Sequence, residues 1–566
     1  MKKIRNRKSA GAAVLGVIFM VAVTIALSST ILFSTQLNDP TPAIIFFSHD
    51  TSSSNELNLI YSAAYDLTWA DLDFRADVAG DFEFLSPQAT AGAYVKCPDE
   101  ECTVTVVYKP TNTMIGEYHF KENHGTTGGT TSSSQGWAIA YGGTSQEHLN
   151  DIAITSSGYL LGGDTNSFGF GGYDMLLVKT DTDGGVQWAK NYGGSGSESI
   201  NAIQLLSSGC LVVGLTTSFG EGNADGLVIK TDDNGNVLWS YSYGKSEDDE
   251  LYAVDTLSDG YIFGGKTMKF PTGYTNDAIV IKTLSDGTVD WARTYGGPGY
   301  DSINNICAKT TSIFLGGSTK SFGLSNKAFF LFSISNSGEL LWGRLYAHAE
   351  HEDRLACLLP TSDGGFLLGG ESLPNNGDPR DCLVIKVNSQ GDVQWSFLYG
   401  TAEHEYLNSM KETPSGYLIG GETRFSGSWE GFTIHIDSNG DIIDAHCCKD
   451  NNGDIISSMA SISGGSLLGG TSTGTTAGSS DFLLIKTGSE GILDCVMDDT
   501  FTPSRKGATI TQYTYEQSGT QDFIPTITTY TNNGLNDDDF ILAAGPAAGL
   551  VSNDAAIITT PVCSSE

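Results

Sequence analysis

Residues 226–243 read GLVIKTDDNGNVLWSYSY, and this stretch decides the fold. Apolar residues alternate in its two halves, 226–231 and 236–241, which predicts two β-strands. The residues between the halves end in Asn234 and Gly235, a pair that strongly favours a tight turn between antiparallel strands. Equivalent turns recur along the chain at 182–184, 285–287, 390–391 and 439–440. The pattern therefore predicts a series of similar β-hairpins.

The spacing of the tryptophans reveals a repeat. Six of them begin near-identical segments at intervals of 51, 51, 52, 51 and 53 residues, namely Trp137, Trp188, Trp239, Trp291, Trp342 and Trp395. Ala445 and Cys495 continue the spacing without the tryptophan. In the second copy the strand signals lie at 200–205, 210–214, 226–231 and 236–241. Four short antiparallel strands in each unit of about 50 residues are typical of β-propeller blades.

Seven sets of three inner strands lie between Trp137 and Cys495, which predicts a mainly β fold with a seven-bladed β-propeller over residues 137–495. The strand at Trp137 precedes the first set, so it can close the ring by completing the seventh blade. The Tyr-Gly-Gly and Lys-Thr-Asp segments make the repeat similar to propeller repeats of exported prokaryotic proteins. That resemblance implies the fold and no particular activity.

Length and charge limit the function classes. The chain has 566 residues, which allows two to four domains, and carries 66 acidic against 30 basic residues, a net charge of −36. Such an acidic surface repels phosphate backbones, so nucleic acid is not expected as a partner. Ten cysteines are compatible with disulfides in an oxidising exterior.

The N-terminus has a basic leader followed by a long apolar run. Residues 1–8 hold five cations, and the run that follows is uncharged over 9–36, with a predicted helix over 9–38. Such a helix would be roughly 40 Å long, enough to cross a bilayer. The apolar region of a secretory signal is shorter, about 7–15 residues. The cations predict that the N-terminus stays in the cytoplasm and that the chain after Asp39 lies outside.

Three interpretations of this run compete: a cleaved signal, a single-pass anchor, or the assembly helix of a type IV pilin. Alternating apolar positions at 43–47, 57–61 and 103–108 predict a small β-sandwich over residues 39–120. Residues 15–24, LGVIFMVAVT, resemble the N-terminal segment of archaeal type IV pilins. Residues 67–72, 91–92 and 106–116 resemble the pilin head of the same family. The resemblance covers about the first fifth of the chain.

The resemblance implies cleavage by a prepilin peptidase between Lys8 and Ala12, and oligomerisation with like or unlike pilins through the helix. The run has no Glu near its start, a difference from bacterial pilins that is expected for the archaeal branch. Small residues let helix backbones approach closely. The assembly residues expected from this segment are Gly11, Ala12, Leu15, Gly16, Ile18, Met20 and Ala22.

Three further segments carry predictions. Cys97 and Cys102 bracket a four-residue loop and are predicted to form a disulfide, because a metal site needs more than two such ligands. Residues 121–136 are rich in Gly, Ser and Thr and predict a flexible linker. Residues 496–566 leave the repeat and hold Thr-rich strands at 509–515 and 526–530. This tail is expected either to cover an exposed sheet edge or to pack back on the propeller.

Cys447 and Cys448 adjoin the copy that has lost its tryptophan, and Cys495 occupies the next such position. A disulfide staple near ring closure is therefore a hypothesis, and the spacing leaves its connectivity open.

Two sets of carboxylates recur in the blades. The first set stands ten residues after each tryptophan: Glu147, Glu198, Asp249, Asp301, Glu352 and Glu405, with Asp454 displaced by one in the seventh copy. The second opens the third strand of each blade, at Asp174, Asp225, Asp277, Asp381, Glu430 and Asp481, and Lys327 breaks it in blade four.

Both loops emerge on the same face, which predicts an acidic ring around the channel. The ring could capture Ca²⁺ or a cationic ligand. We favour the alternative that the acids accept backbone N–H groups and lock neighbouring blades, because features repeated in every blade are usually scaffold.

Departures from the repeat are more informative. The loop before blade five carries His348, Glu350 and His351, and the loop before blade six carries His404. Histidines and acids on adjacent loops are potential ligands for Zn²⁺ or another transition metal. The competing interpretation is an ordinary solvated polar loop.

The sequence as a whole predicts an exported surface subunit rather than an enzyme. A pilin module would join a filament, held in the membrane before assembly, and the tethered propeller would be displayed outside for adhesion or capture of a surface ligand. The alternative is a membrane-anchored extracellular propeller receptor, or a hydrolase or lyase, that does not polymerise. No cofactor is expected beyond Ca²⁺ or another divalent cation.

Overall fold

The computed structural model describes most of the chain from residue 136 to 516, with gaps at 170, 270–274, 425–427, 449–452, 464, 474–478, 488–496 and 499–500. Outside that range, and at 269 and 497–498, it describes only the backbone of individual strands. Among the described residues no helix is long and apolar enough to span a membrane. Several predictions fall on parts of the chain outside the described residues. These parts are the leader 1–8, the predicted helix 9–38, the linker except for residue 136, Cys495, and the side chains of Cys97 and Cys102.

The chain divides into two compact units, of which the smaller consists mainly of Met1–Ser132. One of its sheets has the order β1 (Ile45–His49), β2 (Glu56–Ser62), β5 (Ala93–Lys96), β4 (Glu83–Phe84). The other has the order β3 (Leu72–Ala76), β6 (Cys102–Tyr108), β7 (Thr113–Phe120). The strands β1, β2 and β6 overlap the three predicted from alternating apolar positions. Their assembly into a sandwich of pilin type stays a prediction.

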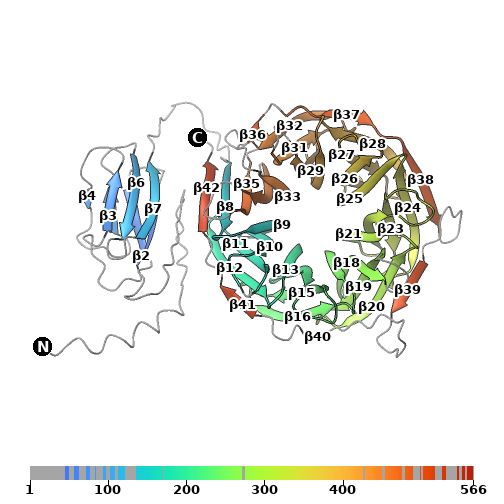
Figure 1. Cartoon of the computed structure of the whole chain (residues 1–566), viewed down its shortest axis with the longest axis horizontal. Coiled ribbons are helices and arrows are strands. Elements are labelled where there is room, and N and C mark those ends of the chain that lie inside the picture. Colours follow the sequence, from blue (N-terminus) through green and yellow to red (C-terminus); the bar gives the residue numbers. More distant parts are fainter. Residues whose placement is uncertain are drawn as a thin grey trace. The chain divides into compact units, whose positions relative to one another are not determined.

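The larger unit contains a seven-bladed β-propeller, as the repeat predicts (Figure 1). In blades one to six the four inner strands follow one another along the chain. Blade one holds β9 (Glu147–Thr155), β10 (Gly158–Thr165), β11 (Asp174–Thr180) and β12 (Val186–Gly193). Blade two holds β13 (Glu198–Leu205), β14 (Cys210–Thr216), β15 (Asp225–Thr231) and β16 (Val237–Tyr243). Blade three holds β17 (Asp249–Leu257), β18 (Gly260–Lys269), β19 (Thr275–Leu284) and β20 (Val289–Gly296).

The same order continues around the ring. Blade four holds β21 (Asp301–Ala308), β22 (Ile313–Thr319), β23 (Ala328–Ile334) and β24 (Leu340–His348). Blade five holds β25 (His351–Pro360), β26 (Phe366–Pro374), β27 (Asp381–Val387) and β28 (Val393–Gly400). Blade six holds β29 (Glu405–Thr413), β30 (Gly416–Thr423), β31 (Glu430–Ile436) and β32 (Ile442–Cys448). Blade seven holds β33 (Ile455–Ile462), β34 (Gly465–Ser472), β35 (Asp481–Lys486) and β8 (Trp137–Gly142).

The first strand of the propeller closes the ring. β8 pairs antiparallel with β35, and its register places Trp137 opposite Lys486 and Tyr141 opposite Phe482. The seventh blade therefore combines one strand from the start of the repeat with three from its end. The prediction that the Trp137 strand completes this blade is confirmed.

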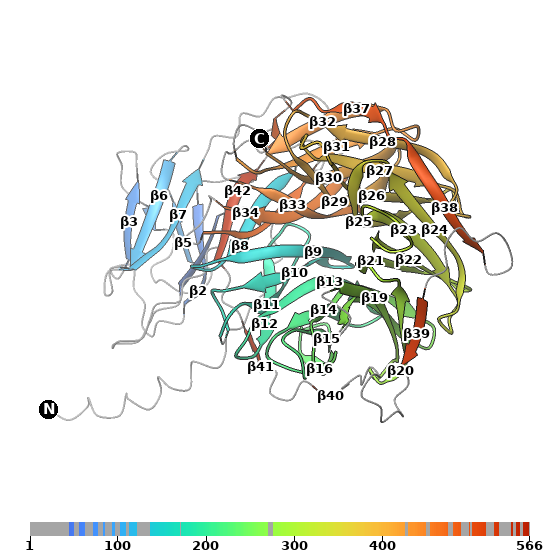
Figure 2. The ribbon, with the colours of Figure 1, turned by 45° about the vertical axis from the view of Figure 1, so that its right-hand side comes forward.

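A fifth strand on every blade comes from the C-terminal tail. These strands, here called the C-terminal belt, are β36 (Met497–Asp498), β37 (Ser504–Gly507), β38 (Ile510–Glu516), β39 (Thr526–Tyr530), β40 (Gly545–Pro546), β41 (Val551–Asp554) and β42 (Ile558–Ser564). They join blades six, five, four, three, two, one and seven in that order, against the direction of the blades (Figures 1 and 2). The tail therefore covers the sheet edges, the first of the two outcomes left open by the sequence.

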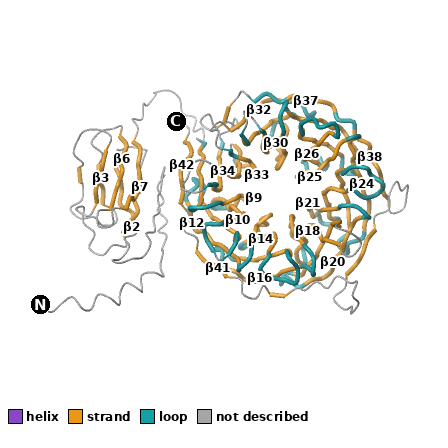
Figure 3. Tube along the Cα trace, in the orientation of Figure 1, coloured by secondary structure: helices purple, strands orange, loops and turns teal. Residues whose placement is uncertain are grey.

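The core lies between the sheets, because each blade packs one face on each neighbour. Strands dominate the described chain (Figure 3), and the third strands β11, β23 and β27 are buried along their whole length. Glycines on second strands allow close packing of blades. A Cβ on Gly264 would meet Ile303 and Ile306 of the next blade. Burial of these apolar faces is the main stabilising term of the ring.

Candidate metal centre on the fifth blade

The first set of carboxylates is buried at the start of the inner strands. Glu198 is typical of the set: its Oε2 accepts the backbone N–H of Gly194 at 2.8 Å, and its Oε1 accepts the Thr216 hydroxyl at 2.8 Å. Its own N–H donates to the Tyr173 carbonyl of the preceding blade at 2.7 Å. Backbone N–H groups bind the corresponding acid in five further blades, at Glu147, Asp249, Asp301, Asp353 and Glu405. These contacts tie neighbouring blades together.

At blade five the buried acid is not the predicted Glu352 but the residue that follows it in the sequence. The buried acid before blade five is Asp353, which is fully buried, whereas the Glu352 side chain is 27% exposed. The Asp353 N–H donates to the Lys327 carbonyl at 3.0 Å, the link that Glu147, Glu198, Asp249 and Glu405 form at this position. The loop after Tyr346 is one residue longer than its equivalents, so counting from the tryptophan selects Glu352 in error. Likewise Ala328, and not Lys327, opens the third strand of blade four.

The second set of carboxylates faces the first across a glycine. A Cβ on Gly142 would collide with Oδ1 of Asp481 and Oε2 of Glu147, and a Cβ on Gly244 would collide with Asp225 and approach Asp249. This crowding explains the glycine that follows the tyrosine in five repeats, at Gly142, Gly193, Gly244, Gly296 and Gly400. Burial raises the pKa of Asp481 to about 7, and the nearby Glu147 carboxylate adds to the shift.

The acids therefore do not form a solvent-facing ring. The described members of both sets are buried, apart from Glu352, with the least buried at 8% exposure. Their neighbours are backbone N–H groups, hydroxyls and one another, and at Asp381 also the Lys506 ammonium at 3.4 Å. Nothing in this arrangement distinguishes one blade as a ligand site.

Blade five differs because two imidazoles meet at its entrance. The His348 and His351 rings stack with their centroids 3.8 Å apart and an interplanar angle of 21°. Both Nδ1 atoms lie against the Ser372 hydroxyl oxygen, at 3.3 Å for His348 and 2.9 Å for His351. The same hydroxyl donates to Asp353 Oδ1 at 2.6 Å. Serine thus links two histidines and one carboxylate in a single cluster.

The ligand atoms of His348, His351 and Asp353 all lie within 4.8 Å of one another. Burial lowers the pKa of His348 to about 4, assisted by the neighbouring His351, and burial also lowers the pKa of His351. Both rings are therefore neutral at pH 7, the state in which imidazole binds metals. Burial raises the pKa of Asp353 to about 7. Two imidazole nitrogens and a carboxylate oxygen suit Zn²⁺ or a similar transition metal.

The other two predicted ligands lie outside this cluster. His404 Nδ1 accepts the backbone N–H of Arg380 at 3.1 Å, so that nitrogen is engaged in holding a loop. Glu350 is exposed and adopts a φ of 63°, which the turn between β24 and β25 requires. Among the acids of this loop the sequence-based selection named Glu350 and left out Asp353, and it missed Ser372 altogether. The extra loop residue after Tyr346 is the signal that could have identified Asp353.

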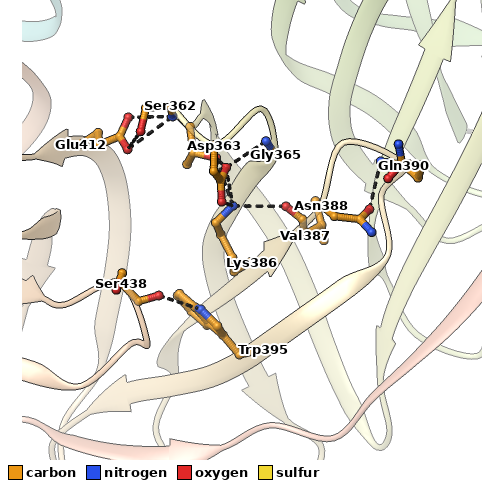
Figure 4. Close-up of polar contacts among 11 residues, drawn as sticks. Ser362, Asp363, Gly365, Lys386, Val387, Asn388, Gln390, Trp395, Glu412 and Ser438 are labelled. Carbon is orange, nitrogen blue, oxygen red and sulfur yellow. Dashed lines mark hydrogen bonds and ion pairs between the residues drawn. The ribbon is translucent and has the colours of Figure 1, made fainter.

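The opposite end of the blades, where the hairpin turns lie, is occupied by contacts within the scaffold (Figure 4). Lys386 Nζ bonds to Asp363 Oδ2 at 2.8 Å, and Glu412 Oε1 accepts the Ser362 hydroxyl at 2.7 Å between blades five and six. Trp395 Nε1 donates to the Ser438 carbonyl at 3.1 Å. A pocket of about 360 Å³ lies here, lined by residues that include Glu412, Tyr417 and Ser438. Glu412 is its sole charged lining group and is already engaged.

Comparisons with known proteins add no identification: no protein-family model and no curated protein matches this sequence.

Proposed function

We propose that this protein is an exported cell-surface subunit that displays its propeller for adhesion or ligand capture. In this proposal the N-terminal segment, which resembles archaeal type IV pilins, joins a filament and the propeller is its cargo. The observation that carries the capture role is the break in blade symmetry at His348 and His351. At the entrances of blades one to six a buried acid accepts backbone N–H groups. Only at blade five, among these six, do two stacked imidazoles lie beside that acid, which is Asp353.

His348, His351 and Asp353 are the residues that would hold a transition metal. When bound, a metal with three protein ligands keeps a coordination position for an oxygen or nitrogen of the captured ligand. The chain itself supplies the geometry: Ser372 orients both imidazoles from one side, and the buried Asp353 would supply a carboxylate oxygen. Such second-layer hydrogen bonds commonly set the orientation of metal-bound histidines.

Equilibrium dialysis against Zn²⁺ tests the capture site. The native chain is expected to retain one Zn²⁺ per chain, and a His348→Ala/His351→Ala double variant is expected to retain none. His404→Ala is the matched control, because that imidazole lies outside the cluster, and it should retain the metal. Equal retention by the native chain and the double variant would remove the metal centre from the proposal.

The filament role needs a separate experiment. Sheared surface filaments from the native cell would be labelled with antibody against the propeller and viewed by electron microscopy, and the mature N-terminus would be read by mass spectrometry. The proposal expects labelled filaments and a mature chain that keeps residues 13–36. A mature chain that begins after Gln36, or a freely soluble monomer, would contradict it. Retention of the apolar run without labelled filaments would favour the alternative, an anchored receptor or enzyme that does not polymerise.

A further inference from the structure

Cationic side chains gather at the entrances of blades four and five. Lys327 and Arg380 immediately precede the third strands of these blades, and Arg354 follows the buried Asp353. The positions equivalent to Lys327 and Arg380 in the other blades hold Tyr173, Ala224, Asn276, Trp429 and Ser480. The repeat is therefore broken here by positive charge, in a chain whose net charge is −36. Scaffold requirements shared by all blades do not account for the change.

The three cations share two carboxylates. Glu352 Oε1 lies 3.9 Å from Lys327 Nζ and 3.3 Å from Arg354 Nη2. Glu371 lies between the two arginines, with its Oε1 3.4 Å from Arg354 Nη1 and its Oε2 3.3 Å from Arg380 Nε. Three cationic and two anionic side chains thus form one ion network. Arg354 is 47% exposed, so its guanidinium remains open to a ligand.

Aromatic rings stand at both ends of this ion network. The Lys327 ammonium lies 3.9 Å from the centre of the Tyr300 ring, and the Arg380 guanidinium lies 4.9 Å from the centre of Tyr406. Tyr406 meets Trp429 edge to face, with centroids 5.4 Å apart. Trp429 is 38% exposed, and no other tryptophan is among the exposed large apolar residues in the described part of the chain.

These side chains form a continuous basic–aromatic strip: Tyr300, Lys327, Arg354, Arg380, Tyr406 and Trp429. We propose that the strip binds an acidic polysaccharide, one that contains hexuronic acid units. A guanidinium pairs with a sugar carboxylate through two parallel N–H···O bonds. The exposed ring of Trp429 offers an apolar surface on which the apolar face of a pyranose ring can pack. Glu352 and Glu371 accept sugar hydroxyls, the groups that a saccharide offers in addition to its charge.

The mixture of groups favours a saccharide over an acidic peptide. A run of Asp and Glu side chains would meet Glu352 and Glu371 with like charge, whereas a uronate chain places hydroxyls between its carboxylates. The strip uses side chains other than those of the metal centre and does not require the filament. It therefore stands or fails independently of the proposed function.

Isothermal titration of the full chain with polygalacturonate, in EDTA, tests the inference. Dextran serves as the uncharged probe and poly-glutamate as the acidic peptide. Polygalacturonate should bind, and the two other probes should not. The Arg354→Gln/Arg380→Gln variant should weaken binding about tenfold or more, since it removes two charge-assisted contacts. Trp429→Ala should also weaken binding, because it removes the exposed aromatic face.

Lys266→Gln is the matched control. Lys266 lies 3.0 Å from Glu250 at the entrance of blade three, so the variant removes one cation from an equivalent blade end outside the strip. Its affinity should equal that of the native chain. Thermal unfolding would establish that each variant is folded. The inference would be overturned if polygalacturonate did not bind, or if the native chain and the double-arginine variant bound it with equal affinity. It would also be overturned if poly-glutamate bound equally well, or if polygalacturonate bound without EDTA but not in its presence.

Discussion

The phenolic hydroxyl of Tyr295 donates a 2.7 Å hydrogen bond to the carbonyl oxygen of Gly338, which lies in the hairpin turn of the next blade. Tyr295 belongs to the Tyr-Gly-Gly segment of one repeat, and Gly338 has a φ of 79° in the turn of the following repeat. The contact recurs at 2.7 Å in four further pairs, Tyr192–Gly235, Tyr243–Gly287, Tyr346–Gly391 and Tyr399–Gly440. Two motifs that lie far apart within each repeat are thus halves of one contact between blades.

Tyr243→Phe should lower the free energy of unfolding by about 1 kcal/mol, because the variant removes the tyrosine hydroxyl that donates to the buried Gly287 carbonyl at 2.7 Å. The ring would remain packed, so the loss reports the hydroxyl alone. Thermal or urea unfolding followed by circular dichroism would measure it. Tyr192→Phe, at another blade, should cost a similar amount, and the two losses should add. Unchanged stability in both variants would show that the contact contributes nothing.

Gly142→Ala should destabilise the propeller by about 2 kcal/mol or more, because the new methyl group overlaps the buried carboxylates of Asp481 and Glu147. Differential scanning calorimetry would follow the loss. Gly507→Ala is the matched control, since a Cβ there meets no atom within 4 Å. If the Gly142→Ala chain were as stable as the Gly507→Ala chain, the carboxylates of Asp481 and Glu147 would be able to move aside without loss of stability.

Stability should fall as pH rises from about 4 to about 7. Burial raises the pKa of Asp249 and of Asp481 from 3.8 to about 7 in the folded chain. Between those values the folded state retains protons that the unfolded state has released, so each pH increase favours unfolding. Unfolding midpoints in urea at pH 5 and pH 8 would test the sign. Asp481→Asn should reduce the slope, and a midpoint that rises with pH would contradict the argument.

Deleting residues 497–566 should lower the thermal midpoint by about 5 °C or more, because every blade loses backbone hydrogen bonds at its outer strand. The exposed edges should also pair between copies, since an open strand edge is a template for another strand. Light scattering after size-exclusion chromatography would detect the association. Deleting only 558–566 should have a smaller effect, because it uncovers blade seven alone. A monodisperse full-deletion chain with an unchanged midpoint would show that the belt is dispensable.

Local patterns predicted the propeller well. Alternation over 226–231 and 236–241 matches β15 and β16, and the Asn234–Gly235 turn lies where the signal placed it. The period of the tryptophans predicted both the blade count and closure by the Trp137 strand. These features depend on side-chain periodicity and turn chemistry, which neighbouring residues specify.

The candidate site was predicted only in part, for reasons of register and distance. His348 and His351 are three residues apart and meet, but His404 lies across a blade boundary and is held by the Arg380 backbone instead. Asp353 was left out because counting at a constant spacing cannot detect one inserted residue. Ser372 was missed because its strand reaches the histidines only once blade five is paired.

The sequence by itself determined the strands and turns, since neighbouring residues specify each of them. It also determined the number of blades and the closing strand, since both follow from the repeat along residues 137–495. Only the tertiary structure decided which edges the tail would cover, because edge pairing uses backbone N–H and C=O groups that are the same in every residue. It also decided which acids are buried in pairs and which polar groups join at blades four to six. Those outcomes depend on packing between sheets, and no single repeat contains both sides of such a contact.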